Sequence, residues 1–239
     1  IYTLSLHDAL PISTSFSKLG RGRFSFGMSW YKLSWKNGTV RNGEMRMAFR
    51  VYMADIVEMW ERGHIVCITV SLEVRHLDLC GVIDRGNAFD LAKRIPNLAR
   101  KLGEYILIGK GEVGFIDERV IAFFTKPRSC RFERCLPDEV HRYNWGQKIP
   151  GGHCIADPVV VARSARQLLR LAIRERLQRV YLPIPGVGDG RLDVADIKEA
   201  LDVLEHSSIV RLISNRHIED AMIEMCGHEP GDDGEIEKT

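Results

Sequence analysis

A glycine-rich loop between two regular elements, residues 180–193, constrains the fold of this chain more than any other stretch. A short β-branched and aromatic run begins at Val180 and ends at Pro183 and Pro185. Three glycines follow at every second position, and an amphipathic pattern begins at Asp193. Because proline and glycine interrupt regular structure, this order predicts a strand, a loop and the first turn of a helix.

Such a loop is suited to binding an anion. Glycine has no Cβ and can adopt a positive φ, so backbone N–H groups can approach a ligand closely, and a helix dipole favours negative charge. The loop therefore favours a phosphate ligand, and a tight turn with no ligand remains the alternative. The sequence matches neither Gly-x-x-x-x-Gly-Lys-Ser/Thr nor Gly-x-Gly-x-x-Gly, so the P-loop and Rossmann interpretations have no specific support.

The two ends of the chain are expected to lie outside the folded domain. Residues 1–13 resemble the conceptual translation of a sequencing adapter, and we interpret residues 1–27 as a non-native leader. A signal peptide is disfavoured because the segment has no basic region and its apolar run is interrupted. Residues 28–46 are an extension that contains candidate start codons, residues 47–216 are one domain, and the acidic residues 217–239 are expected to be disordered.

Charge and cysteine usage narrow the functional classes. The net charge of +2 comes from residues 1–27, since acidic and basic residues balance in the remainder. Nucleic-acid or membrane binding therefore has no electrostatic support, although a local patch remains open. No apolar run is long enough to span a membrane. The six cysteines show no disulfide-framework spacing, which favours a reducing cytoplasm.

Apolar patterning predicts alternating strands and helices. Asp157 is expected to cap a helix whose first residue is Pro158. The buried stripe of that helix is predicted to be Val161, Ser164, Ala165, Leu168, Leu169, Ala172 and Ile173. Strands are expected at residues 50–53, 65–70, 112–115, 119–124, 180–182 and 209–213, and helices at 87–95, 98–102, 158–173 and 194–204.

Two stretches fit this alternation poorly. Residues 56–60 form a further short apolar run, and residues 126–153 show no period, so we interpret the latter as a long surface excursion with one short helix at 137–143. The alternation as a whole predicts an α/β fold, a three-layer α/β/α sandwich with a mixed, mostly parallel sheet. Ligands bind such sheets at the carboxyl ends of the strands, here after Val70, Phe124 and Leu182.

Four motifs in order resemble the macro domain, the ADP-ribose-binding module, over about residues 47–215. The family patterns are Gly-Asp-Ile, a buried strand with Gly-Val-Met-Gly-x-Gly-x-Ala, Phe-Pro-Thr-Lys, and Leu-Pro-Arg-x-Gly-Cys-Gly with Leu-x-Trp. The matching segments are Ala54-Asp55-Ile56, residues 65–68 followed by 81–88, Phe123-Phe124-Thr125-Lys126-Pro127, and Leu182-Pro183-Ile184-Pro185-Gly186-Val187-Gly188 with Leu192-Asp193.

The resemblance implies a binding site for ADP-ribose. Asp55 would accept a hydrogen bond from the adenine amino group, with a solvated turn or cap as its alternative role. Two glycine loops would hold the pyrophosphate through backbone amides. The expected ligand-binding residues are Asp55, Ile56, Ser71, Gly81, Val82, Gly86, Asn87, Pro183, Gly186, Val187, Gly188, Gly190 and Arg191. We expect a monomer without cofactor or metal whose partner is ADP-ribose or an ADP-ribosylated macromolecule, with nucleic acid only as a modified substrate.

One branch of the family uses a strand-end lysine as nucleophile toward the anomeric carbon, and Lys126 matches it by position. The partner aspartate of that branch would fall at Gly190, whereas this chain has Asp189 one residue earlier. Lys126 and Asp189 are thus the candidate catalytic pair for removal of ADP-ribose from an ester-linked protein carboxylate or a modified nucleobase. Their alternatives are a solvated lysine and a turn aspartate. Ser71 replaces an asparagine of the larger branch.

Asp84 departs from the family, because it replaces a glycine of the first phosphate loop. Its carboxylate would repel a pyrophosphate unless it points outward or pairs with Arg85 or Arg191. The departures keep two other functions open, a non-catalytic ADP-ribose or nucleotide reader and a structural domain that has lost its pocket. A zinc site is disfavoured by the loose spacing of Cys130, Cys135, His141, His153 and Cys154.

Overall fold

The computed structural model describes residues 51–109 and 111–214, which belong to the compact unit Arg46–Thr239. The predictions for the leader, the start codon and the acidic tail lie outside the described residues. In the part of the chain that is described, no helix combines the length and apolarity needed to cross a membrane.

A six-stranded mixed sheet forms the centre of the domain, with the strand order β1-β8-β7-β2-β4-β3. Neighbouring strands pair in parallel except β3, which pairs with β4 in the antiparallel direction at one edge. The predicted sheet type is therefore confirmed. The strands are β1 (Val51–Met53), β2 (Ile65–Ser71), β3 (Gly114–Asp117), β4 (Val120–Lys126), β7 (Val180–Pro183) and β8 (Val210–Ser214).

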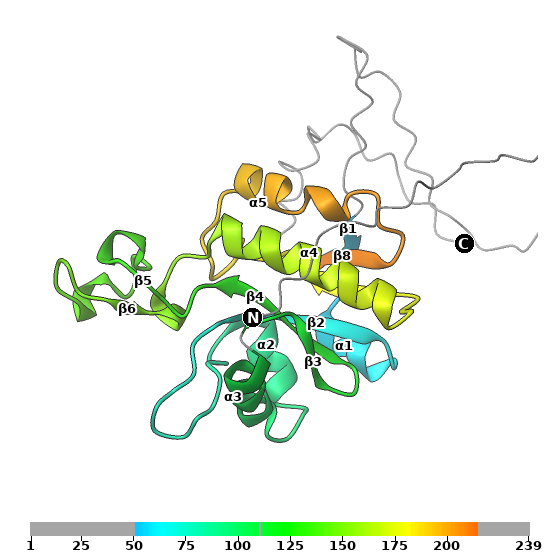
Figure 1. Cartoon of the computed structure of the whole chain (residues 1–239), viewed down its shortest axis with the longest axis horizontal. Helices are drawn as coiled ribbons and strands as arrows, with labels where there is room; N and C mark the ends of the chain where they lie inside the picture. The colour runs from blue at the N-terminus through cyan, green and yellow to red at the C-terminus, as the bar shows by residue number, and fades with distance from the viewer. Residues whose placement is uncertain (1–50, 110, 215–239) are drawn as a thin grey trace, which may run out of the picture. The chain divides into compact units, whose positions relative to one another are not determined.

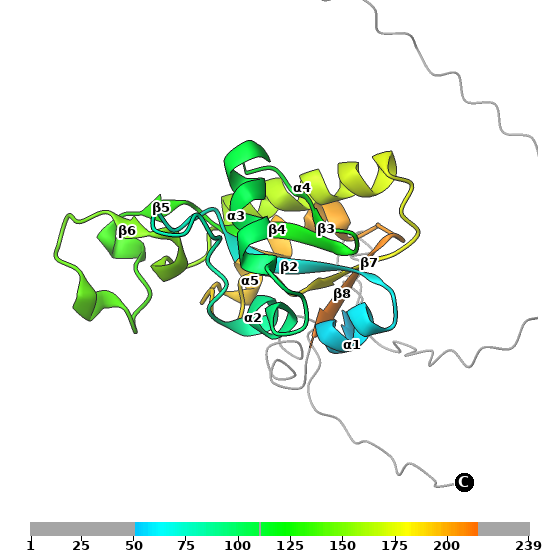
Figure 2. The ribbon, with the colours of Figure 1, turned by 90° about the horizontal axis from the view of Figure 1, so that it is seen from below.

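Helices cover both faces of this sheet, as expected for a three-layer sandwich. Figures 1 and 2 show α4 and α5 on one face and α1, α2 and α3 on the other. The helices are α1 (Ile56–Glu61), α2 (Gly86–Ala92), α3 (Leu98–Gly109), α4 (Pro158–Arg174) and α5 (Val194–Ala200). Single turns of 3-10 helix are η1 (Phe132–Arg134), η2 (Val140–Arg142), η3 (Gly151–His153) and η4 (Asp202–Leu204).

The core lies along the two central strands β2 and β4. Every residue of Val120–Lys126 is buried, and Val66, Cys67 and Ile68 of β2 are completely inaccessible. A strand covered on both faces needs apolar residues at consecutive positions, which explains the uninterrupted apolar runs in these segments. Leu102 of α3 and Leu168 of α4 belong to the same core cluster.

The long helix α4 confirms the predicted cap, and its buried stripe differs in part from the prediction. Asp157 accepts a hydrogen bond from Val159 N at 2.9 Å, and Pro158 opens the helix. Ile173 was predicted to be buried but is 61% exposed, while Leu171 is buried in its place. The last turn of α4 thus faces the core through Leu171 and Ala172, one position earlier than the pattern suggested.

Helix α1 occupies the segment 56–60 that had been interpreted only as an apolar run. Asp55 accepts hydrogen bonds from Val57 N at 2.8 Å and Glu58 N at 3.2 Å, which starts the helix. Ile56 and Met59 are buried at a spacing of three residues, the spacing of one helical face. The N-cap residue Asp55 therefore favours a helix in a segment that is too short to show a helical period.

The surface excursion predicted at residues 126–153 begins one residue later, because Lys126 belongs to β4. Residues 127–153, called the excursion below, contain regular structure of their own. A two-stranded sheet closes the excursion at its base, with β5 (Ser129–Cys130) antiparallel to β6 (Ile149–Pro150). The helix expected at 137–143 is a single 3-10 turn, η2. A disulfide joins Cys130 to Cys154, contrary to the expectation of unpaired cysteines. The cysteine spacing gave no sign of it because the pairing depends on the return of the chain along β6.

The parallel pairing of β2 with β4 contains one irregularity, at the end of both strands. Val70 lies opposite Phe124, and the next residue of β2, Ser71, lies opposite Lys126. Thr125 is thus an extra residue on β4, as in a β-bulge. Its carbonyl oxygen accepts a hydrogen bond from Asp157 N at 2.8 Å, which connects the bulge to the cap of α4.

Candidate functional site

A cavity of about 690 Å³ opens at the carboxyl ends of the parallel strands. Residues from the ends of β2, β4, β7 and β8 line it, together with Ala54 and Asp55 after β1. Parallel strands end at the same edge of a sheet, so their following loops converge there. The cavity is therefore a product of the fold and lies where the strand order predicts it.

Two loops line the cavity, the first loop (residues 82–86) and the second loop (residues 186–190). They approach each other closely, because a Cβ added to Gly86 would lie 3.0 Å from the carboxylate of Asp189. Gly86 and Gly186 have positive φ angles of 64° and 84°, which non-glycine residues rarely adopt. Gly188 faces open space, because a Cβ added there would have no neighbouring atom within 4 Å.

The structure brings nearly all the predicted site residues to this cavity. Gly81 is the exception, because it packs against α3, where a Cβ would come within 2.5 Å of Leu102. The predicted residues that line the cavity are Asp55, Ile56, Ser71, Val82, Gly86, Asn87, Lys126, Pro183, Gly186, Val187, Gly188, Asp189, Gly190 and Arg191.

Lys126 ends β4 beside the cavity, and its side chain is buried although it carries an amine. The residue is 8% exposed. Nζ donates hydrogen bonds to the carbonyl oxygens of Gly152 at 3.2 Å and Asp189 at 3.4 Å. These two acceptors come from the excursion and the second loop, so the amine is held between segments far apart in the sequence. Lys126 is therefore not the solvated strand-end lysine that was considered as the alternative.

The environment of Lys126 lowers its pKa from 10.5 to about 8. Burial is the largest cause, because removal of water disfavours the charged form, and the positive charge of Arg85 is the second. The neighbouring carboxylates of Asp189, Asp84 and Glu139 act in the opposite direction. At pH 7 about a tenth of the molecules then carry the neutral amine, which is the nucleophilic form.

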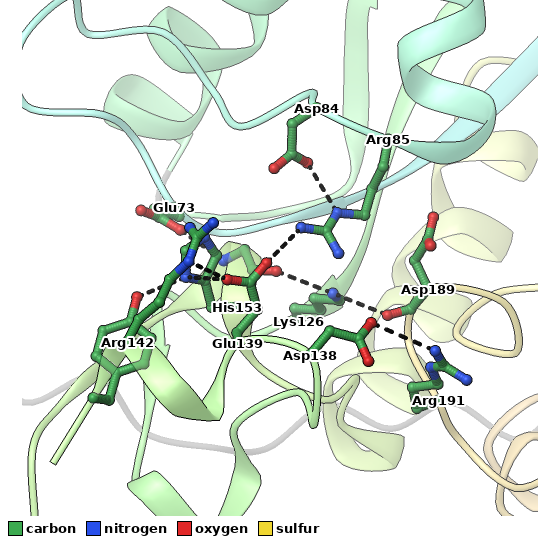
Figure 3. A network of polar contacts seen from close by, with 12 residues as sticks. Glu73, Asp84, Arg85, Lys126, Asp138, Glu139, Arg142, His153, Asp189 and Arg191 are labelled. Carbon is green, nitrogen blue, oxygen red and sulfur yellow. Dashed lines mark hydrogen bonds and ion pairs between the residues drawn. The ribbon is translucent and has the colours of Figure 1, made fainter.

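Asp189 contacts Lys126 through its backbone rather than its side chain. Figure 3 shows the carbonyl oxygen of Asp189 directed toward Nζ and the carboxylate directed away. The position that the family aspartate would occupy, Gly190, is closed to a side chain, because a Cβ there would lie 2.4 Å from the carbonyl oxygen of Gly186. Neither position therefore presents a carboxylate in hydrogen-bonding contact with Lys126 in the described structure.

Arg85 lies between two carboxylates at the rim of the first loop (Figure 3). Its Nη2 donates a hydrogen bond to Oε1 of Glu139 at 3.1 Å, and its Nε lies 3.6 Å from Oδ1 of Asp84. Asp84 is thus paired with Arg85, one of the two arrangements under which its charge would be tolerated. The other candidate partner, Arg191, instead lies 3.5 Å from Asp138 of the excursion.

Glu139 is a buried carboxylate that the excursion carries into the site. Its Oε2 lies 3.0 Å from Nε of Arg142 and 3.6 Å from Nδ1 of His153, without hydrogen-bond geometry to either. Burial acts to raise the pKa of Glu139, but the hydrogen bond from Arg85 and the neighbouring positive charges hold this pKa below its usual value. Tyr143 completes the cluster through a 2.6 Å hydrogen bond between its hydroxyl and Nδ1 of His153.

The cavity lining also includes Asp55, Asn87 and Ser71. Asp55 lines it while Oδ1 caps α1, so the cap role considered for this residue is realised. Asn87 is linked to the end of β2, because Thr69 N donates to its Oδ1 at 3.4 Å and its Nδ2 donates to Thr69 Oγ1 at 3.3 Å. Ser71 is buried, and its hydroxyl accepts a hydrogen bond from Glu73 N at 3.4 Å.

Sequence reasoning missed the contribution of the excursion to this site. Gly152 lines the cavity and accepts from Lys126, while its own N–H donates to Oε2 of Glu73 at 2.6 Å. The Gly151-Gly152 pair was visible as a turn signal, but nothing local indicated its place beside Lys126. Glu139 had no signal at all, since its partner Arg85 lies 54 residues away.

Comparison with known proteins gives likenesses of fold. No family model matches the chain, and no curated protein matches it. The macrodomain of Mycobacterium tuberculosis DarG is 16% identical with a TM-score of 0.42, covering 70% of this chain and 95% of that one. An Oceanobacillus iheyensis macrodomain mutant is 12% identical with a TM-score of 0.46, covering 77% and 93%.

A third solved structure contains a ligand. Thermosipho africanus DarTG in complex with ADP-ribose is 12% identical with a TM-score of 0.42, and the match covers 63% of this chain and 37% of that one. Identities and TM-scores this low carry no functional argument for this chain. Its function has to be inferred from its own cavity.

The cysteines and histidines of the excursion form no metal centre in the described structure. Cys130 and Cys154 are bonded to each other, and no group of three or more His, Cys, Asp or Glu residues in the described ranges is arranged to hold a metal ion.

Proposed function

We propose that this chain is a macro domain that binds ADP-ribose in the cavity and releases it from an ester-linked carboxylate or a modified nucleobase by means of Lys126. The observation that carries the proposal is a buried lysine with a pKa near 8 at the strand end where two loops converge. A structural lysine gains nothing from a lowered pKa, whereas a nucleophilic amine requires one because only its neutral form attacks.

The size and lining of the cavity suit a dinucleotide-like ligand. Binding cavities for small molecules measure about 300–1,000 Å³, and this one falls within that range. The second loop offers backbone groups at Gly188, where a Cβ would meet no neighbouring atom within 4 Å, and this open space suits a pyrophosphate. In the proposed pose the adenine lies toward Asp55 and the distal ribose toward Lys126.

Lys126 would act as a nucleophile in its neutral form. A neutral amine can donate its two N–H groups to the carbonyl oxygens of Gly152 and Asp189 and keep its lone pair for attack. The nitrogen bonds to the anomeric carbon while the bond from that carbon to the acceptor atom breaks. The acceptor leaves with the bonding electrons, as a carboxylate or as a base anion that takes up a proton. The nitrogen loses its proton to solvent, and water then hydrolyses the carbon–nitrogen bond to restore the amine and release ADP-ribose.

A non-catalytic reader is the second candidate, and one observation favours it. The carboxylate expected near the lysine is absent from Gly190 and directed away at Asp189. A domain without a proton acceptor could bind ADP-ribose and leave its linkage intact. Binding and turnover must therefore be tested separately.

Binding is tested by calorimetric titration of the full chain with ADP-ribose, with AMP as the comparison ligand. We expect micromolar affinity for ADP-ribose, and loss of binding in Gly188→Glu, since that side chain would enter open space in the cavity. Ala195→Glu is the matched control, because it places the same side chain at an exposed position of α5 outside the lining. Absence of heat with millimolar ADP-ribose from the folded wild type contradicts the proposal.

Turnover is tested with a protein carrying ADP-ribose on a carboxylate and with an oligonucleotide carrying it on a base. Lys126→Ala is expected to retain ADP-ribose binding and to lose release of ADP-ribose by about a hundredfold or more. Binding without any release by the wild type would establish the reader instead.

A further inference from the structure

Arg85 is the cationic side chain that enters this cavity from the first loop. It is half-buried and belongs to the lining, whereas the other lining arginine, Arg191, is 58% exposed and paired with Asp138. Lys126 loses its charge as pH rises through its pKa of about 8, whereas an arginine stays charged. Arg85 therefore provides the permanent positive charge that lies partly out of water at this site.

Glu139 fixes the position of this guanidinium. The carboxylate reaches Arg85 from the excursion, and its residue is 7% exposed. Both of its oxygens lie next to cations, with Arg85 at Oε1 and Arg142 at Oε2. A charge-assisted contact with this buried carboxylate favours one orientation of the arginine. The Nη1 group of Arg85 makes no hydrogen bond within the described residues, which leaves its N–H donors for a ligand.

Asp84 makes such a cation necessary. It lies in the wall that would face an anionic ligand, and its negative charge opposes binding there. Its nearest cation is Arg85, at 3.6 Å. Backbone amides alone would have to overcome the negative charge of this carboxylate, whereas an adjacent arginine offsets that charge and adds further N–H donors.

We propose that Arg85 is a specificity-determining residue that binds the phosphate groups of the ligand, with Glu139 as its positioning residue and Asp84 as the charge that it offsets. The inference rests on the proposed function for the identity of the ligand. It adds a side-chain contact to a site otherwise built from backbone groups, and it selects ligands that carry phosphate near the first loop.

Titration of the full chain with ADP-ribose tests the role of Arg85, with variants that are expected to change the affinity in opposite directions. Arg85→Gln is expected to weaken binding by about 10- to 100-fold, the usual effect of losing a charge-assisted hydrogen bond. Arg85→Lys keeps the charge and should recover most of that loss. Asp84→Asn removes the repulsive carboxylate and should tighten binding by about two- to tenfold. Because Asp84 is exposed, this last variant keeps the test valid even if the arginine variants do not fold.

Arg100→Gln is the matched control, since Arg100 is an exposed arginine paired with Glu104 on α3 and does not line the cavity. It should bind ADP-ribose within about twofold of the wild type if the charge inside the cavity is what matters. Equal affinity of Arg85→Gln and the wild type would overturn the inference. So would equal weakening in Arg85→Gln and Arg85→Lys, because shape rather than charge would then be responsible.

A failure of the proposed function can be told apart from a failure of this inference. If the wild type binds no ADP-ribose, the same variants are titrated with inorganic pyrophosphate. Pyrophosphate binding that is lost in Arg85→Gln and regained in Arg85→Lys would support the anion-binding role without the nucleotide. Pyrophosphate binding that is absent, or unchanged by Arg85→Gln, would reject it.

Discussion

The amine of Lys126 donates a hydrogen bond to the backbone carbonyl oxygen of Asp189, at 3.4 Å, whereas the carboxylate of the same residue points away from it. A carbonyl is present whatever the side chain, so the second loop can hold the amine without a specific residue at this position. The carboxylate influences Lys126 only through its charge, which raises the pKa of the lysine. The two contributions of Asp189 can therefore be separated by mutation.

Asp189→Asn tests that separation. The carbonyl contact remains, so the maximal rate of ADP-ribose release should stay within about threefold of the wild type. Loss of the negative charge should lower the pKa of Lys126, so the rate should reach half its maximum at a lower pH. A pH series of initial rates checks both. A loss of rate comparable to that of Lys126→Ala would instead identify the carboxylate as the proton acceptor.

The wild-type rate should rise with pH and level off above about pH 8, because the reactive amine is neutral and its pKa is about 8. The rate should fall about tenfold for each pH unit well below that value. Arg85→Lys keeps the neighbouring charge and should leave the inflection nearly in place. A rate independent of pH between 6 and 9 would show that Lys126 does not deliver the nucleophile.

Burial of Lys126 should reduce the stability of the fold at neutral pH. Its pKa in the unfolded chain is near 10.5 and in the folded chain about 8, so the unfolded state binds more protons between these values. Stability therefore rises with pH across this window. Lys126→Met should be more stable than the wild type by about 1–3 kcal/mol at pH 7, with the difference fading as pH approaches 10.5.

Chemical denaturation at pH 7 and pH 10 measures this difference. The control is Lys93→Met, which alters an exposed lysine of the surface pair with Asp90 and should change stability little at either pH. If Lys126→Met were less stable than the wild type at pH 7, the amine would be contributing more through its two carbonyl contacts than burial costs.

Two glycines of the second loop should respond differently to the same substitution. Gly190→Ala places a Cβ only 2.4 Å from the carbonyl oxygen of Gly186. This overlap should destabilise the fold by about 1–3 kcal/mol. Gly188→Ala meets nothing within 4 Å and should leave stability unchanged. Thermal unfolding of the two variants checks the contrast, and equal melting temperatures would contradict the packing described for Gly190.

The disulfide should stabilise the excursion that carries Gly152 and Glu139. Cys130 and Cys154 are 24 residues apart, and closing a loop of that size contributes about 3 kcal/mol in the chain-entropy description. Cys130→Ser should lower the melting temperature and make it insensitive to dithiothreitol. Cys80→Ser is the control, because Cys80 is unpaired and should keep the sensitivity of the wild type. A wild type that melts identically with and without reductant would contradict a stabilising bond.

The regular elements were predictable because their signals are local. The apolar run of β2 and the Asp157-Pro158 start of α4 each depend on neighbours within a few residues, and both were predicted correctly. Helix α1 was missed because six residues are too few for a period, so its cap, Asp55, was the only available sign. Ile173 was misplaced because it lies five residues after Leu168 and therefore points off the buried stripe, which continues through Leu171 and Ala172, three and four residues after Leu168.

The sequence indicated which loop residues lie together, but it did not indicate the contacts between the charged residues. Glycine spacing and strand order brought 14 of the 15 candidate residues to one cavity, with Gly81 outside it. The contact of Glu139 with Arg85 spans 54 residues, and Glu139 belongs to an excursion whose return to the sheet is closed by the disulfide and the β5–β6 pair. No pattern within the excursion encodes that return.

The extra residue Thr125, at the end of β4, determines which residue of β2 lies opposite Lys126. Lys126 lies opposite Ser71 only because β4 is one residue longer than β2 over the same distance. A design that places this lysine in another parallel sheet would therefore need the extra residue before it as well as the lysine itself. Without that extra residue, the lysine side chain would point to the other face of the sheet.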